Sequence, residues 1–515
     1  MESGSIAAPQ AGSAPAGSAP GEKGLKTGAL GFVSNVVIGV ASTAPGYSLA
    51  ASLGLVVGVA GIGTHSPGIL LAAFVPMLFI AASYYYMNRA DPDCGTTFSW
   101  VTRAMGPWAG WIGGWAIIVA DVIVMANLAQ IAGLYSFRLF DWSSAADSTT
   151  AVTIVGVVWI AIMTAICVYG IELSARTQVG LLGAELITLA IFAVVALVKV
   201  AAGHGGPNSI DPSISWISPF GVDSANAFVD GVLLSVFIYW GWDSTVTVNE
   251  ESENSSETPG RAAIVSTFIL LLTYVIVSVA AQSYNGTKEL ADHSDDIFDQ
   301  LGHNVLGSPL DKLLIIAVLT SAAASTQTTI LPTARTSLSM ARARAMPESL
   351  GRIHPRFLTP HISTILMGTL SIVWYVGLTI VSENILFDSI AALGLMIAFY
   401  YGLTGFACVV YYRRELFNSA RNLVMIGVLP LLGGLMLFAI LIKSCVDLSK
   451  PANSESGNSW LGVGPPLIIG VGSMLLGVVL MLWWYAAGHR EFFRRKPEVV
   501  SPEVLAAAPA TGREG

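Results

Sequence analysis

The chain has 515 residues, of which 54% are hydrophobic and only 11% are charged. This charged fraction is less than half of the roughly 25% typical of soluble domains, so an ordinary soluble protein is excluded. The formal net charge of −8 adds little, because the positions of the charges matter more than their sum. Apolar runs of about 18 or more residues recur along the whole length, and each is long enough to cross a bilayer as a helix. We therefore expect an all-α polytopic membrane protein.

The two ends of the chain differ from its middle. Residues 1–22 are mostly Ala, Gly, Ser and Pro, and residues 497–515 are again polar and rich in Pro and Ala. Such compositions cannot bury a core, so we expect two disordered tails. The stretch between them, 23–496, is predicted to form a single membrane domain surrounded by the lipid bilayer.

Twelve apolar segments predict about twelve transmembrane helices. They are 28–58, 67–88, 109–137, 152–172, 178–201, 226–249, 262–284, 310–340, 362–382, 386–412, 422–446 and 461–487. An even number of crossings puts both termini on one side. If that side is the cytoplasm, 19 of the 25 Lys and Arg fall in inner segments, as the positive-inside rule requires. The sequence therefore predicts an integral protein of the cell membrane with both termini cytoplasmic.

The first segment carries an interruption at its centre, ASTAPGYS (residues 41–48). Pro45 has no N–H group and its ring opposes a continuing helix, while Gly46 adds backbone freedom. A helix broken in mid-membrane leaves polar backbone groups that lipid cannot satisfy, so the break must be buried in protein or line a cavity. The alternative is a simple proline kink patched by the Ser and Thr hydroxyls.

The sixth segment carries a second interruption, YWGWDS (residues 239–244). A Gly between two Trp residues, followed by the carboxylate of Asp243, suits a cavity or a partner better than lipid. The alternative is an Asp that is hydrogen-bonded within the helix bundle.

Interruptions in helices one and six fall at corresponding positions if helices 1–5 and 6–10 form two halves, about 28–201 and 226–412. Paired interruptions of this kind are typical of secondary transporters with inverted repeats. A half-helix N-terminus would receive a substrate carboxylate on its N–H groups, and the opposing carbonyls would suit an ammonium group. The predicted substrate-binding residues are Ser42, Thr43, Ala44, Pro45, Gly46, Tyr239, Trp240, Gly241, Trp242 and Asp243.

The first segment with its interruption and three further stretches resemble the amino acid–polyamine–organocation (APC) superfamily of permeases. The three stretches are GTTFSWVTRAMGPWAGWIGGW (95–115), YWGWDSTVTVNEES (239–252) with PGRAA (259–263), and ARTSLSMARARAMPESLGRIHPRFLTP (334–360). The resemblance covers about residues 25–490. It implies a leucine-transporter-like 5+5 inverted-repeat fold, two extra C-terminal helices at about 422–487, alternating access, and coupling to protons or sodium.

Two acidic residues are candidates for coupling or a proton relay. Many proton-coupled relatives place a Lys in helix five where this chain has Ala184 and Glu185, so we expect Glu185 to take or release the coupled proton. Asp121, in helix three, could carry a proton or face a substrate amine. A hydrogen bond to a neighbouring helix is the structural alternative for both carboxyl groups.

Helix eight offers hydroxyl groups at Ser321, Ser325 and Thr328, whose spacing puts them on one face. By resemblance to sodium-coupled carriers, they form a possible ion site with the carbonyls of helix one. Close helix packing by small residues is the alternative. At the inner end of helix six, Glu250 and Glu251 could pair with Arg residues as a gate or stay solvated.

Other classes of function find no support in the sequence. The four Cys are scattered without metal-ligand spacing, and there is no Ser-His-Asp or nucleotide motif. We therefore expect no enzyme, no cofactor, no metal site and no nucleic-acid partner. The sequence predicts a secondary active transporter that imports an amino acid or related small amine with proton coupling. The alternatives are a non-transporting sensor or partner subunit on the same fold, a sodium-coupled carrier and an exchanger.

Overall fold

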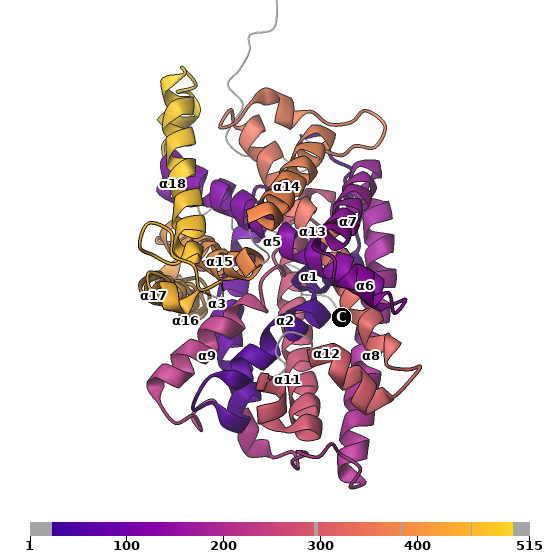
Figure 1. The fold of residues 1–515 in the computed structure, drawn as a ribbon. Helices are drawn as coiled ribbons and strands as arrows, with labels where there is room; N and C mark the ends of the chain where they lie inside the picture. The colour runs from indigo at the N-terminus through magenta and orange to yellow at the C-terminus, as the bar shows by residue number, and fades with distance from the viewer. Residues whose placement is uncertain (1–22, 293–296, 382–383, 455, 498–515) are drawn as a thin grey trace, which may run out of the picture.

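A computed structural model describes residues 23–292, 297–381, 384–454 and 456–497, and it is built from helices (Figure 1). The predicted tail 1–22 and residues 498–515 of the second tail lie outside the described residues. Within the described part of the chain there is no β-strand, only two isolated bridges. The expectation of an all-α protein is confirmed.

Eleven helical spans in the described residues are long and apolar enough to cross a membrane. The helices that form them are α1 (Phe32–Thr43) with α2 (Pro45–Gly58), α3 (Ser66–Ala90), α5 (Pro107–Arg138), α7 (Thr149–Tyr169), α8 (Ile171–Ala201), α11 (Thr258–Asp292), α13 (Lys312–Arg342), α14 (His361–Val381), α15 (Asn384–Tyr411), α17 (Leu429–Leu448) and α18 (Pro465–Ala486). The remaining predicted span, 226–249, is α9 (Ala225–Phe237) followed by the single turn α10 (Ser244–Thr247).

Some boundaries differ from the sequence prediction. Helix five was expected at 178–201, but α8 begins at Ile171, so that only Gly170 separates it from α7. Gly170 has φ of 141°, a backbone conformation that glycine adopts without strain, and the chain reverses there in a single residue. The prediction left residues 173–177, which include Arg176, between two spans.

The helix α4 (Thr97–Met105) was not predicted as a separate element. Its sequence TFSWVTRAM is too short and too polar to resemble a span. Gly106, with φ of 104°, ends it, and Pro107 occupies the first turn of α5, where its missing N–H costs nothing. The remaining short helices are α6 (Ser143–Ala146), α12 (Ile297–Leu301) and α16 (Ala420–Asn422).

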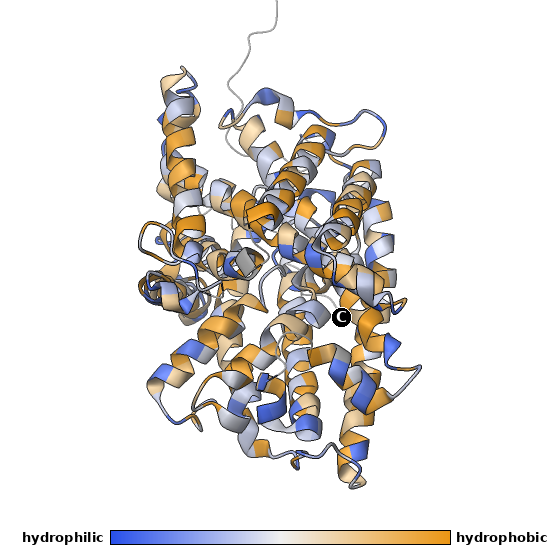
Figure 2. Cartoon of the chain, in the orientation of Figure 1, coloured by the Kyte–Doolittle hydropathy of each residue, from blue (hydrophilic) through white to orange (hydrophobic). Residues whose placement is uncertain are grey.

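The bundle has a buried centre and a lipid-facing rim. In α5, α13 and the α1–α2 pair, 78% of the most apolar window is buried, against 22% in α18. The outer helices α14 and α18 are apolar along much of their surface, as Figure 2 shows. Helices that are apolar on every side suit contact with lipid. The polar residues at the centre of α13 and α1 are thereby kept away from the bilayer.

Candidate functional site

The first helix breaks where the sequence predicts. The helix α1 ends at Thr43, Ala44 adopts the left-handed conformation with φ of 49°, and Pro45 begins α2. The N–H of Ala44 turns back to the carbonyl of Ala41 at 3.1 Å. This is a true interruption, because Ala44 leaves helical geometry, and the kink alternative is wrong.

The carbonyl groups freed at this break are bound by hydroxyls. The Ser325 hydroxyl, on α13, donates to the carbonyl of Ser42 at 2.9 Å. The Ser48 hydroxyl donates to the carbonyl of Thr43 at 2.7 Å. Burial therefore leaves neither carbonyl without a donor, as a break inside the membrane requires.

The N–H groups that begin α2 are bound by side chains of other helices. The N–H of Gly46 donates to Oε1 of Glu185, on α8, at 2.7 Å. The N–H of Tyr47 donates to the hydroxyl of Ser321, on α13, at 3.1 Å. Glu185 is fully buried, and its Oε2 has no hydrogen-bond partner among the described residues. A carboxylate of the protein thus occupies the helix N-terminus where the sequence analysis places a substrate carboxylate.

The second break lies directly against the first. The helix α9 ends at Phe237, and Gly241 follows with φ of 117°. A Cβ on Gly241 would stand 2.7 Å from the carbonyl oxygen of Ser42, so a larger residue does not fit. The hydroxyls of Ser42 and Ser244 are 2.7 Å apart. Two segments about 200 positions apart in sequence therefore share one site, at residues 42–46 and 238–244.

Asp243 is the acceptor of a cluster of tyrosine hydroxyls. Tyr401 donates to Oδ1 at 2.7 Å, and Tyr400 and Tyr84 donate to Oδ2 at 3.3 and 3.4 Å. The indole N–H of Trp240 donates to the Tyr400 hydroxyl at 2.5 Å. Asp243 is 4% exposed, so its charge depends on these donors.

Asp121 is the second carboxylate beside this cluster. It lies on α5, is 3% exposed, and accepts a hydrogen bond from the Thr333 hydroxyl of α13 at 2.6 Å. Its helix α5 packs against α13 and against α15, the helix that carries Tyr400 and Tyr401. The hydrogen bond to a neighbouring helix that the sequence analysis gave as the alternative is therefore present. It does not exclude a contact between Asp121 and the substrate.

Other predicted residues have mainly local partners. Thr328 donates to the carbonyl of Ala324 in its own helix at 3.1 Å, so only Ser321 and Ser325 of the possible ion site contact the break. Tyr239 donates to the carbonyl of Leu70 at 3.1 Å, which anchors the second break to α3.

Sequence reasoning missed Tyr84, Tyr400, Tyr401 and Thr333. The Tyr-Tyr pair at 400–401 was a weak signal, since aromatic residues in a membrane span are usually part of the packed core.

At the end of the bundle that the sequence analysis assigns to the cytoplasm, called the inner end below, buried ion pairs join the helices. Arg335 donates to both carboxylate oxygens of Glu251, at 2.5 and 2.8 Å, and both side chains are almost fully buried. Arg103 lies 2.9 Å from Asp91 in the preceding loop. The view of Glu250 and Glu251 as solvated surface charge is wrong, because both are buried.

Lys23, the first described residue, forms ion pairs at the same end of the bundle. Its ammonium lies 2.8 Å from Asp93 and 2.7 Å from Glu250. Burial alone lowers the pKa of Lys23, but the surrounding charges, that of Asp93 foremost, raise it well above its usual value. Asp93, Cys94 and Glu250 are spaced as metal ligands could be, and the Lys23 ammonium is the cation that they surround.

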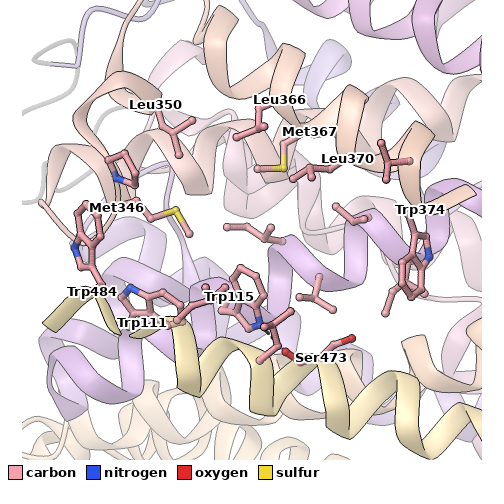
Figure 3. Close-up of a pocket in the computed structure, with 18 of the residues that line it drawn as sticks. Trp111, Trp115, Met346, Leu350, Leu366, Met367, Leu370, Trp374, Ser473 and Trp484 are labelled. Atoms are coloured by element: carbon pink, nitrogen blue, oxygen red, sulfur yellow. Dashed lines mark hydrogen bonds between the residues drawn. The ribbon is translucent and has the colours of Figure 1, made fainter. Parts of the chain in front are cut away.

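A large groove lies elsewhere, between α5, α14, α18 and the loop before α14 (Figure 3). It encloses about 670 Å³ and is lined by apolar and aromatic side chains such as Trp115, Met367 and Trp374. None of the residues that line it is charged. It therefore offers no charged side chain to pair with an ammonium or a carboxylate, and it is distinct from the site at the two breaks.

A helical membrane protein whose first and sixth spans break beside each other has the architecture of a secondary transporter with inverted repeats. The chain belongs to the amino acid permease family, whose sequence profile matches residues 28–471. It is therefore a transporter of the APC superfamily and not an enzyme, and its all-helical fold is consistent with the predicted leucine-transporter-like fold.

Several similar proteins are transporters by name. An uncharacterized transporter of Mycobacterium tuberculosis is 28% identical over 66% of this chain and 71% of its own length. The branched-chain amino acid permease BcaP of Lactococcus lactis is 24% identical over 56% of this chain and 63% of its own. The low-affinity putrescine importer PlaP of Escherichia coli is 20% identical over 84% of this chain and 91% of its own.

Replacing Gly241 by Ala tests the contact between the two breaks. The new methyl group meets the Ser42 carbonyl, and a non-glycine residue at this φ costs about 1–3 kcal/mol of strain. We expect transport by the variant in proteoliposomes to be largely lost.

Gly180→Ala is the matched control, because a methyl group added at Gly180 on α8 would meet no atom within 4 Å. It should transport like the wild type. If Gly241→Ala also did so, the close approach of the two breaks would be wrong.

Neutralising Arg335 and Glu251 tests the inner ion pair. Breaking a buried pair by removing one partner costs about 3–5 kcal/mol, because the other charge is left uncompensated. In thermal unfolding of the purified protein, Arg335→Gln and Glu251→Gln should each lower the melting temperature. The melting temperature of the double variant should be higher than that of either single variant. Additive losses in the double variant would show that the two residues do not act as a pair.

Proposed function

We propose that this protein imports an amino acid or related small amine by alternating access and couples import to the movement of protons. The observation that carries the proposal is the hydrogen bond from the Gly46 N–H to Glu185. It links α8 to the broken helix through a group that can gain and lose a proton.

The chemistry of this contact supplies a coupling mechanism. An ionised carboxylate at a helix N-terminus is stabilising by about 0.3–1 kcal/mol, and up to about 2 kcal/mol in partly buried geometries. Protonation of Glu185 at the unpartnered Oε2 removes that charge and weakens the hold of α8 on α2. The proton thereby alters how tightly the broken helix is held, which is what coupling to transport requires.

The ion pairs at the inner end indicate which contacts must break when the site opens to that side. Release of substrate to that side requires the Arg335–Glu251 and Lys23–Glu250 pairs to separate. By the positive-inside rule that side is the cytoplasm, with both termini there and the protein in the cell membrane. In this mechanism the two halves, about 28–201 and 226–412, move against each other.

The relatives support the broad substrate class. Their names include a branched-chain amino acid permease, a putrescine importer and, from Latilactobacillus sakei, an arginine/ornithine antiporter. All of these compounds carry an ammonium group at neutral pH. An amino acid or amine is thus the class that our proposal assigns to this chain.

Sodium coupling is the second candidate. The Ser325 hydroxyl already contacts the Ser42 carbonyl, and Ser321 contacts the N-terminus of α2. Hydroxyl and carbonyl oxygens are hard ligands of the kind that Na⁺ prefers. Uptake into proteoliposomes under a pH gradient alone and under a Na⁺ gradient alone distinguishes the two modes.

Glu185→Gln tests the proton role. The amide oxygen can still accept the Gly46 N–H, but the side chain no longer titrates, so the fold should persist while coupling is lost. We expect pH-gradient-driven accumulation of labelled substrate to fall to the level without a gradient, with substrate binding retained.

The control is Glu172→Gln at the start of the same helix, where the carboxylate is half-exposed and pairs with Lys26. It should accumulate substrate normally. Wild-type accumulation by Glu185→Gln would refute the role of Glu185. No uptake of any amino acid or amine by the wild type under either gradient would favour the sensor alternative.

A further inference from the structure

The N-terminal N–H groups at the first break are all taken by the protein. Pro45 has none, Gly46 donates to Glu185, and Tyr47 donates to Ser321. The next N–H, that of Ser48, returns to the carbonyl of Ala44 at 2.7 Å. A substrate carboxylate that bound here would have to displace the carboxylate of Glu185.

At the second break, three N–H groups are likewise used within the protein. The N–H of Ser244 turns back to Gly241 at 3.0 Å, and that of Val246 returns to Asp243 at 2.8 Å. The Gly241 N–H points to the Tyr401 hydroxyl at 3.5 Å. The side chain of Asp243 adds a negative charge at this place. Both breaks therefore present a carboxylate of the protein where a substrate anion would bind.

The balance of buried charge points the same way. Glu185, Asp243 and Asp121 are all buried around the breaks. Among the described residues the buried Lys and Arg are Lys23 and Arg335, and both are paired with carboxylates at the inner end. Even with Glu185 protonated, Asp121 and Asp243 have no basic side chain beside them. An incoming carboxylate would find no basic partner in a poorly solvated site, and the desolvation of its charge would cost several kcal/mol.

The lining of the site favours a cation. The rings of Trp242 and Tyr401 stack with centroids 5.3 Å apart, and Tyr84 lies edge-on to both, at 5.1 and 5.8 Å. Two of these rings carry hydroxyls that donate to Asp243, those of Tyr84 and Tyr401. Aromatic faces beside a carboxylate attract an ammonium group both through the ring quadrupole and through charge.

We propose that the substrate is an organic amine that carries at least one ammonium group and no carboxylate, with its ammonium bound at Asp121 beside the Asp243–tyrosine cluster. This inference rests on the proposed transport function and narrows its substrate class. The Glu185 carboxylate takes the place that an amino acid's own carboxylate would fill at the first break.

Matched pairs of ligands that differ only by the α-carboxylate test the proposal. Binding of putrescine against ornithine, cadaverine against lysine and isobutylamine against valine is measured by calorimetry on the purified full-length protein. The favoured member of at least one pair should be the amine, by about 100-fold, because a buried carboxylate without a basic partner costs several kcal/mol. Comparing the two diamines with isobutylamine shows whether the site prefers a ligand with two ammonium groups or with one. Equal or tighter binding of the amino acids, or no binding of any amine, overturns the proposal.

Variants locate the ammonium. Asp121→Asn should weaken amine binding by about 30-fold or more, since a buried charge contact is worth about 2 kcal/mol or more. Asp121→Glu, which keeps the charge, should recover much of the affinity, and Glu172→Gln should bind like the wild type. Unchanged amine binding by Asp121→Asn, in a protein that elutes and melts like the wild type, overturns the placement.

The substrate proposal and the transport proposal can be refuted independently of each other. Amine binding without gradient-driven uptake of any amine would refute the transport proposal and leave the substrate class standing. Gradient-driven uptake of amino acids without amine binding would support the transport proposal and refute the amine substrate.

Discussion

The whole arrangement depends on one constraint, that a helix broken inside a membrane must have its backbone groups bound by protein. Around residues 42–48, Ser325 and Ser48 bind the two carbonyls, and Glu185 and Ser321 bind the two N–H groups. These four side chains lie on α2, α8 and α13 and are all buried. The contacts that make the break possible are therefore the same contacts that join the helices expected to move.

This double role of the same contacts explains why the proposed coupling residue lies at the proposed substrate site. Glu185 satisfies a backbone N–H and also carries the charge that a proton can cancel. Asp243 is held by three tyrosines from α3 and α15, so it connects the second break to helices on the other side of the site. The buried ion pairs of Arg335 and Lys23 lie at the end of the bundle that our proposal assigns to the cytoplasm.

Much of the fold could be predicted because interruptions and apolar length are local properties of sequence. Pro45 and Gly241 marked both breaks, and the apolar segments marked the spans. The occupant of the first break could not be predicted, because it depends on α8 lying against α2, a contact between residues 139 positions apart. For the same reason Glu185 was recognised as a coupling candidate without its partner, and Tyr84, Tyr400 and Tyr401 were not recognised at all. The solvated alternative for Glu250 and Glu251 was wrong because both are buried, and their partners Lys23 and Arg335 are far away in sequence.

The central claim is that substrate binds where the two helix breaks meet. A structure of the protein determined with a bound amine tests it most directly. The account predicts density for the amine between residues 42–46 and 238–244, with its ammonium within hydrogen-bonding distance of Asp121. Density confined to another place, such as the apolar groove of Figure 3, would contradict it.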